Sequence, residues 1–443
     1  MNISMKRSIK FSWALAFALF VTAANGQDTT RLSLLFLGDI MQHDSQIADA
    51  YNAKNGTYDY RECFQHIRPY IEGVDLAIGN LEVTLAGRPY KGYPQFSAPD
   101  ELLVALKDLG LDVLVTANNH CVDRGKAGVD RTIAMLDSFN IPHTGTFRNQ
   151  AEKNKLHPLI VERQGFRLAI LNYTYGTNGL PVTRPNIVNL LDTAMMRKDL
   201  EKAVSMKPDV IIVFPHWGTE YLSLPSSTQK AITELCFRYG ARLVIGAHPH
   251  VLQPMEWRKS KDQLVAYSLG NFVSGQRKRY TDGGAMIRIE LGKVTFNDGS
   301  SVTAIDTAGY ILEWVYRDPY QNYYVLPSPD VEEQPGAFVL DSEARTAFKT
   351  FVSDSRALFG KYNINVTEFN SAPDYYVDFD PTDSRGVVKY LEANTSMRKV
   401  SGSRHPTVRI GPYTLPDALH MMKRIRDELD VERAEIRKGA DDL

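Results

Sequence analysis

The sequence is poor in cysteine and carries almost no net charge. Its 443 residues include three cysteines, Cys63, Cys121 and Cys236, and no two of them form a Cys-x-x-Cys pair. A disulfide framework and a thiolate zinc site are therefore excluded, and we expect all three to be small buried or half-buried residues. Lysine and arginine number 51 against 52 acidic residues, a net charge of −1. Without a global basic field, nucleic acid is not an expected partner.

The apolar run near the N-terminus is short for a membrane span. Three basic residues precede an apolar stretch over residues 11–24, whereas a span needs about 20 apolar residues. A basic region, a short apolar run and small residues after it describe a secretory signal peptide, which we predict over residues 1–26. An uncleaved anchor is the alternative. We therefore expect an exported, periplasmic or extracytoplasmic protein with no stable membrane span after signal cleavage.

The chain is long enough for two or three domains, and its first part alternates short apolar runs with helical patterns. We predict strands over residues 32–37, 75–78, 111–115, 159–161, 168–171, 210–214 and 264–267, and at the apolar run that starts at Val244. We predict helices over residues 100–109, 125–139, 191–206 and 228–239. This alternation indicates a layered α/β domain over about residues 31–275. We expect residues 276–443 to form a C-terminal extension, with strands predicted over 284–291 and 301–315 and helices over 342–359 and 415–438.

Almost every predicted strand of the first domain ends in a potential metal ligand. These residues are Asp39, Glu82, Asn119, His216, His248 and His250, and His120 follows Asn119 directly. Because chemistry in open α/β sheets gathers at the carboxyl ends of the strands, we expect the strands to share one sheet and the ligands to converge. Carboxylate, amide and imidazole ligands suit Mn, Fe or Zn, one or two ions in number. Two ions would activate a bridging water, leaving His120 free to act as general acid.

Each of these residues also has a structural explanation. Asp39 could cap a helix, Glu82 could be a solvated loop charge, and Asn119 could supply a left-handed turn. His216 could be a core residue at a strand end, and a His-x-His pair occurs by chance. The metal interpretation is favoured because all these alternatives would have to hold at equivalent strand ends.

Six segments, in this order, resemble the motif series of the CapA family, the poly-γ-glutamate capsule synthesis proteins: LFLGDIM, IGNLEVTL, VTANNHCVDRGKAGV, PHWGTEY, IGAHPHVLQPME and YSLGNF. That family is related to the calcineurin-like metallophosphoesterases. The resemblance covers about residues 31–275. It implies an α/β fold, a four-layer α/β/β/α sandwich with a two-metal site at the sheet edge, to which we add the C-terminal β plus helical extension.

The resemblance also implies roles for single residues. Asn119, His216, His248 and His250 match metal ligands, Asp39 matches the leading aspartate, and His120 matches the group that assists the leaving group. Two positions depart from the wider phosphoesterase pattern. Met41 stands where that pattern has a histidine, and a thioether is a poor ligand for a hard ion. The bridging aspartate is replaced by Asn80 or Glu82, and we favour Glu82 because it keeps the charge.

Two functions remain open. The first is an exported metal-dependent hydrolase that acts on a phosphoester, or a related bond, in capsule or cell-surface polymer metabolism. The second is a non-catalytic envelope protein that binds an anionic polymer such as poly-γ-glutamate during its synthesis, transport or anchoring. In either case envelope biosynthesis proteins are possible partners. We expect Arg277, Lys278 and Arg279 to bind the anionic substrate, although a solvated charge run is the alternative.

Overall fold

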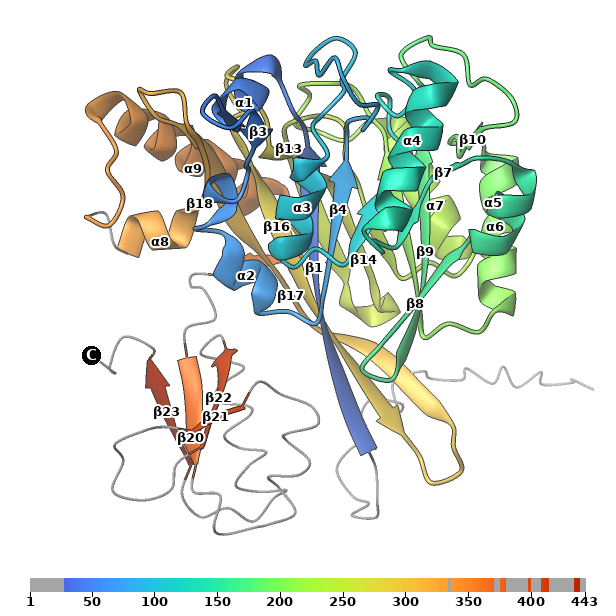
Figure 1. Ribbon diagram of the computed structural model, residues 1–443. Helices are drawn as coiled ribbons and strands as arrows, with labels where there is room; N and C mark the ends of the chain where they lie inside the picture. The colour runs from blue at the N-terminus through green and yellow to red at the C-terminus, as the bar shows by residue number, and fades with distance from the viewer. Residues whose placement is uncertain are drawn as a thin grey trace, which may run out of the picture.

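Two β-sheets lie face to face, with helices on the outer side of each (Figure 1). The computed structural model describes residues 28–333 and 336–369, and four short strands beyond them. Strand β1 (Asp28–Ile40) shows why the layers form, because its side chains alternate between two cores. Leu34 and Phe36 belong to the apolar core between the sheets, whereas Leu35 and Leu37 belong to the core under the first helix layer.

The first sheet has nine strands and holds the N-terminal ligands. Its order is β18 (Tyr323–Pro327), β17 (Ser301–Arg317), β16 (Gly283–Thr295), β1, β4 (Leu76–Leu81), β5 (Val113–Val115) and β6 (His143–Thr144), while β15 (Asn271–Val273) pairs with β1 and β19 (Thr367–Glu368) with β17. Strands β1, β4, β5 and β6 are parallel, whereas β16 to β18 are antiparallel. Strands β16 and β17 follow residue 276 in the sequence, so part of the C-terminal extension completes this sheet.

The second sheet has six strands in the order β13 (Leu252–Arg258), β14 (Gln263–Leu269), β12 (Leu243–Ile245), β11 (Val210–His216), β9 (Phe166–Thr174) and β8 (Leu159–Arg163). Its four central strands are parallel, so their carboxyl ends reach one edge. Smaller pairs are β2 (Tyr51–Asn52) with β3 (Thr57–Tyr58), and β7 (Thr146–Phe147) with β10 (Ile187–Val188). A separate antiparallel sheet contains β20 (Tyr375–Phe379), β21 (Met397–Lys399), β22 (Val408–Tyr413) and β23 (Ala434–Lys438).

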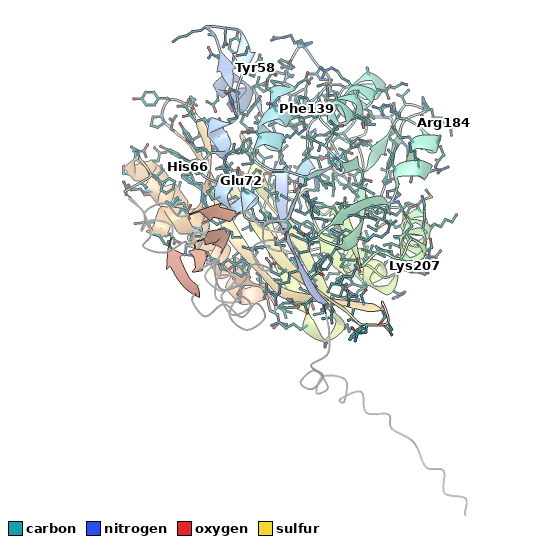
Figure 2. All side chains as sticks on the ribbon, turned by 60° about the horizontal axis from the view of Figure 1, so that its bottom comes forward. Tyr58, His66, Glu72, Phe139, Arg184 and Lys207 are labelled. Carbon is teal, nitrogen blue, oxygen red and sulfur yellow. The ribbon has the colours of Figure 1, made fainter. Side chains whose placement is uncertain are left out.

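The helices complete the four layers. On the first sheet lie α1 (Asp44–Asp49), α2 (Arg68–Glu72), α3 (Glu101–Asp108) and α4 (Gly125–Ser138); on the second lie α5 (Gln150–Leu156), α6 (Thr193–Ser205) and α7 (Ser227–Arg238); α8 (Ser328–Glu333) and α9 (Ser342–Tyr362) follow. Figure 2 shows His66 and Glu72 on the side of the first sheet and Arg184 and Lys207 on the side of the second. Helix α7 begins at a capping box, in which Ser226 and Gln229 each accept a backbone hydrogen bond from the other. None of the helices in the described part of the chain is long and apolar enough to cross a membrane.

The predicted strands and helices of residues 31–275 are present. In the C-terminal extension, the two strands predicted over 284–291 and 301–315 and the helix predicted over 342–359 are present as well. One expectation about their arrangement is wrong. The ligand-bearing strands do not share one sheet, because β1, β4 and β5 belong to the first sheet and β11 and β12 to the second. Apolar runs identify buried strands but carry no information about which sheet each one joins. Of the helix predicted over 415–438, the last five residues form strand β23, and the rest lies outside the described residues, as does the predicted signal peptide.

Gly246 directly follows β12 and lies close to the Tyr267 backbone and the Trp217 side chain. A Cβ atom there would lie far inside contact distance of the Tyr267 carbonyl and the Trp217 indole nitrogen. We expect Gly246→Ala to lower the free energy of unfolding by about 1–3 kcal/mol, since backbone must shift to accommodate the methyl group. Gly360→Ala in α9 is the control, because nothing lies within 4 Å of its Cβ and alanine favours helix by about 1 kcal/mol. Urea unfolding measures both, and a Gly246→Ala midpoint equal to that of the wild type would contradict this packing.

Candidate metal centre

Loops from both sheets bring the predicted ligands together. Asp39 lies in β1, Glu82 follows β4, and Asn119 follows β5 of the first sheet; His216 ends β11, and His248 and His250 follow β12 of the second. All six side chains are buried. The two stacked sheets thus present their carboxyl-end loops at a common edge, and the site lies between the sheets.

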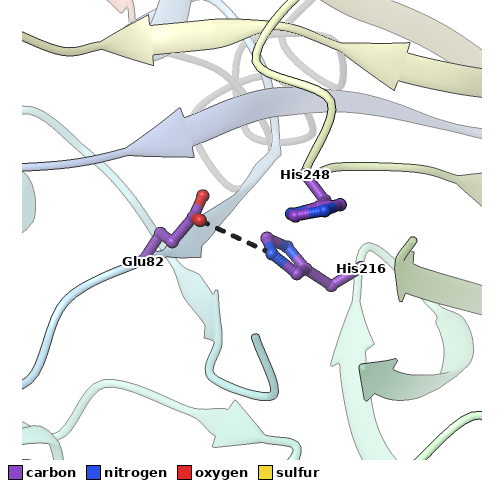
Figure 3. Close-up of side chains that lie close together, drawn as sticks. All are labelled: Glu82, His216 and His248. Atoms are coloured by element: carbon purple, nitrogen blue, oxygen red, sulfur yellow. Dashed lines mark ion pairs between the residues drawn. The ribbon is translucent and has the colours of Figure 1, made fainter. Parts of the chain in front are cut away.

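The carboxylates of Asp39 and Glu82 are surrounded by imidazoles. Asp39 Oδ2 lies 3.1 Å from His250 Nδ1, and the backbone N–H of His248 donates to the same oxygen at 3.3 Å. Glu82 Oε1 lies 3.5 Å from His216 Nε2 and 3.8 Å from His250 Nε2. Figure 3 shows Glu82 facing the imidazole of His216, with the His248 ring beside it.

Two amide side chains join this cluster. Asn119 Oδ1 lies 2.8 Å from His216 Nε2, so its amide oxygen faces the same imidazole nitrogen as Glu82. Asn80 donates from Nδ2 to Asp39 Oδ1 at 2.8 Å. Asn80, the alternative to Glu82 as bridging residue, is therefore also part of the cluster, but it supplies a neutral donor where Glu82 supplies a carboxylate.

The side chains form three overlapping sets, and within each set the potential ligand atoms lie within 4.8 Å of one another. The sets are Asp39, Glu82 and His250; Glu82, His216 and His248; and Glu220, His248 and His250. The first two sets share Glu82, so its carboxylate stands between two places where an ion could be held. Glu220 is exposed and was not among the predicted ligands. Its place four residues after His216 in the segment PHWGTEY is the signal that could have identified it.

The chemistry of these groups fits a divalent cation. Both carboxylate oxygens of Glu82 and Nδ1 of His248 are buried without a hydrogen-bond partner among the described residues, an arrangement that is costly unless another group satisfies them. Burial, followed by the charge of Asp39, raises the pKa of Glu82 well above its usual range. Burial also lowers the pKa of His248 to about 3, which keeps the imidazole in its neutral, metal-binding form. The buried cluster therefore suits divalent metal binding.

The backbone around the two histidines is held in an unusual conformation. His248 and His250 have φ angles of 102° and 57°, and nearby Tyr221 has a φ of 67°. Residues with side chains rarely adopt such angles, at a cost of about 1–3 kcal/mol each. The backbone N–H of Tyr221 donates to the Pro249 carbonyl at 2.8 Å, which ties this loop to the turn between the histidines. This strained backbone orients the imidazoles of His248 and His250 toward the carboxylates.

His120 directly follows Asn119 and is held by a carboxylate that was not among the predicted site residues. Its Nδ1 lies 2.8 Å from Asp123 Oδ2, and both side chains are buried. Because an ionised carboxylate only accepts, Nδ1 carries a proton and Nε2 is left for another partner. The ring of His120 also packs edge-on against Phe96, with centroids 4.7 Å apart. An aspartate three residues after the histidine was the available signal for this pair.

The Met41 side chain is buried in the apolar core on the outer side of the first sheet. His43, two residues further on, accepts a hydrogen bond at Nδ1 from the Gly275 backbone at 3.1 Å. Burial lowers the pKa of His43 to about 4, so this imidazole is neutral at pH 7.

The side chains of the basic run 277–279 contact three different partners. Arg277 lies over the ring of Tyr323 at 5.0 Å, and Arg279 pairs with Asp354 of α9 at 3.0 Å. Lys278 lies over the ring of Tyr221, with 4.1 Å from Nζ to the ring centroid. Since the Tyr221 ring lies 6.3 Å from that of His250, Lys278 is the member of this run that the structure places beside the cluster.

Residues 33–276 match the model of the bacterial capsule synthesis protein family PGA_cap. The chain belongs to this family. It is 31% identical over 285 residues to the capsule biosynthesis protein CapA of Bacillus anthracis, covering 61% of this chain and 66% of that protein. It is 28% identical over 271 residues to the PGA biosynthesis protein CapA of Bacillus subtilis, covering 59% and 68%. The resemblance to CapA proteins predicted from the motifs is thereby confirmed.

The solved structures that the chain matches include two nucleotidases. The NAD nucleotidase of Haemophilus influenzae is 13% identical, with a TM-score of 0.41 and coverage of 83% of this PGA_cap chain and 68% of that one. The 5'-nucleotidase of Candida albicans is 11% identical, with a TM-score of 0.36 and coverage of 73% and 58%. The α/β/β/α sandwich described above rests on the sheets and helices of this chain itself.

Proposed function

We propose that this PGA_cap protein is an exported metal-dependent hydrolase that cleaves a phosphoester, or a related bond, in capsule or cell-surface polymer metabolism. The observation that carries the proposal is the buried carboxylate of Glu82. It has no hydrogen-bond partner among the described residues and stands between two sets of imidazole and carboxylate ligands. Export rests on the predicted signal peptide of residues 1–26.

Two ions are proposed, with Mn, Fe or Zn as the expected metals. Asp39, Glu82 and His250 would hold one ion. Glu82, Asn119, His216 and His248 would hold the other. Two such ions, when bound, supply an activated water and neutralise charge on the reacting phosphoryl oxygens.

His120 is the proposed proton donor. Asp123 accepts from Nδ1, so a protonated His120 presents its Nε2–H to the leaving-group oxygen. The contact with Phe96 fixes the plane of the ring. Lys278, which lies over the Tyr221 ring, would attract an anionic substrate.

The names of the two relatives favour a second function. Both refer to biosynthesis of a capsule or of PGA, and neither refers to cleavage. In this alternative the protein holds an anionic polymer such as poly-γ-glutamate without cleaving it, with envelope biosynthesis proteins as partners.

Metal content and hydrolysis together decide between the two functions. We expect the wild-type protein to bind about two ions and to hydrolyse phosphomonoesters or phosphodiesters when Mn, Fe or Zn is added. The variant His248→Ala/His250→Ala is expected to lose both metal binding and hydrolysis. The reason is that His250 belongs to the ligand set with Asp39, and His248 belongs to the ligand set with His216. Elemental analysis and release of phosphate or alcohol measure them. No hydrolysis with any metal, together with saturable binding of poly-γ-glutamate, would replace the hydrolase with the polymer-binding protein.

A further inference from the structure

Tyrosines from three different loops surround the candidate metal centre. Tyr93 follows β4, Tyr175 follows β9 and Tyr221 follows β11. Their exposed fractions are 65%, 47% and 37%, so a large part of each ring faces solvent. We call these residues the tyrosine rim. Exposed aromatic rings that gather at one place, beside convergent polar groups, are typical of ligand-binding surfaces.

Two members of the tyrosine rim lie directly against the ligand histidines. The centroid of the Tyr175 ring lies 4.5 Å from that of the His248 ring. The backbone N–H of Tyr175 donates to the His216 carbonyl at 3.0 Å. The Tyr221 ring lies 6.3 Å from that of His250. These backbone links hold the rings at fixed positions relative to the ions' ligands.

Tyr93 reaches the other side of the site through Phe96. The Tyr93 and Phe96 rings are 6.4 Å apart, and Phe96 lies against His120. The rim therefore extends from the ligand histidines to the side where the leaving group would depart.

The conformation of Tyr221 indicates more than packing. A tyrosine at a φ of 67° is unfavourable, and glycine would adopt this angle at no steric cost. The residue stays there because its N–H is bound to Pro249, and this places its ring between His250 and Lys278. Strain kept at a partly exposed aromatic residue points to a role in binding.

The charges at the rim do not favour a simple polyanion. Lys278 lies over Tyr221, whereas Glu220 adds a carboxylate next to it. These charges oppose each other, so the rim offers aromatic surface rather than a row of cations. Aromatic surface of this kind binds the apolar face of a ring.

We propose that the tyrosine rim is a stacking subsite for a ring joined to the phosphoester that the metal centre cleaves, either a sugar ring or a nucleobase. This inference rests on the proposed function, because it assigns the rim to the group that flanks the scissile bond. The substrate class is then a phosphate ester of a ring-bearing alcohol.

The test compares three phosphomonoesters on the full chain loaded with Mn: glycerol 3-phosphate, which is acyclic, glucose 1-phosphate, which carries a sugar ring, and AMP, which carries a nucleobase. At least one ring-bearing ester is expected to bind about tenfold more tightly than glycerol 3-phosphate, in line with the energy of stacking one base on an aromatic side chain. Affinity is measured as KM where the ester is hydrolysed and by calorimetry where it is not. Tighter binding of glucose 1-phosphate would identify the ring as a sugar, and tighter binding of AMP would identify it as a nucleobase.

Variants connect this preference to the rim. Tyr175→Leu/Tyr221→Leu is expected to reduce the ratio of the affinity for the ring-bearing ester to that for glycerol 3-phosphate to about one. Tyr175→Phe/Tyr221→Phe is expected to keep this ratio, because the rings remain. Tyr320→Leu is the matched control, since Tyr320 is an exposed tyrosine on the turn before β18. Metal content is measured for each variant. If the double leucine variant loses its ions, Tyr93→Leu tests the rim instead, because its ring does not contact a ligand histidine, and it is expected to reduce the ratio by about threefold.

Equal affinities for the three esters in the wild-type protein would overturn the subsite, and so would a ring preference that survives loss of the rings. Failure of the proposed function gives a different result. In that case no ester is hydrolysed, yet calorimetry still shows the ring preference and its loss in the leucine variants. That outcome would support the subsite and remove the hydrolase.

Discussion

Glu82→Gln is expected to remove both bound ions and to lower metal-dependent hydrolysis by about a thousandfold. A loss of that size corresponds to about 4 kcal/mol of transition-state stabilisation, within the several kcal/mol that a metal centre supplies. The reason is the position of Glu82, whose carboxylate belongs to the ligand sets on both sides of the cluster. Glutamine keeps the volume of the side chain and removes the negative charge that the ions need. Elemental analysis and steady-state kinetics measure the two losses.

The same substitution is expected to leave the metal-free protein at least as stable as the wild type. Neither Glu82 oxygen accepts a hydrogen bond from the described residues, so no partner is left unsatisfied when the charge is removed. Thermal unfolding with and without Mn should therefore show a metal-dependent rise in Tm for the wild type and none for Glu82→Gln.

Glu313 offers a matched control for this prediction. It is also a fully buried glutamate without a partner among the described residues, but it lies on β17 and belongs to none of the ligand sets. Glu313→Gln is expected to keep the metal content of the wild type. Two ions retained by Glu82→Gln, or lost equally from Glu313→Gln, would contradict the role of Glu82 as the shared ligand.

The positions of the candidate ligands in the fold were predictable because these residues follow the ends of apolar runs. Asp39, Glu82 and His216 each come at or just after a buried strand, and the strands were recognisable from their β-branched and aliphatic residues. The sheet that each strand joins was not predictable from the residues alone. Strands β4 and β11 have the same buried character on both faces, yet they lie in different sheets.

Residues in loops were harder to place because no periodicity fixes their direction. Arg277, Lys278 and Arg279 are consecutive, and their side chains nevertheless lie against Tyr323, Tyr221 and Asp354. These three contacts are long-range, and they depend on tertiary structure that a single sequence does not encode locally. Asp123 is a different case, because it lies only three residues after His120 and its spacing was the signal that could have identified it.

His120→Ala is expected to slow hydrolysis in a way that depends on the leaving group. General acid catalysis contributes about 10²–10⁴-fold when the leaving oxygen must be protonated. We therefore expect a loss of that size in kcat for an alkyl phosphoester and a loss of less than about tenfold for a p-nitrophenyl phosphoester, because p-nitrophenolate leaves without a proton. Asp123→Asn is expected to fall between His120→Ala and the wild type, since the amide still meets Nδ1 but no longer supplies a negative charge.

The leaving-group dependence separates proton donation from a structural role. A variant that merely disturbs the site, for example by displacing Asn119, would lose metal and slow both substrates equally, so metal content is measured alongside kcat. His143→Ala serves as the control, because His143 is another buried histidine paired with an aspartate, with 3.1 Å from Nε2 to Asp137 Oδ1, and it lies outside the ligand sets. It is expected to keep the wild-type ratio of the two rates. An equal loss on both substrates in His120→Ala with full metal content would show that His120 orients the substrate or a ligand, and the proton would then have to come from another group.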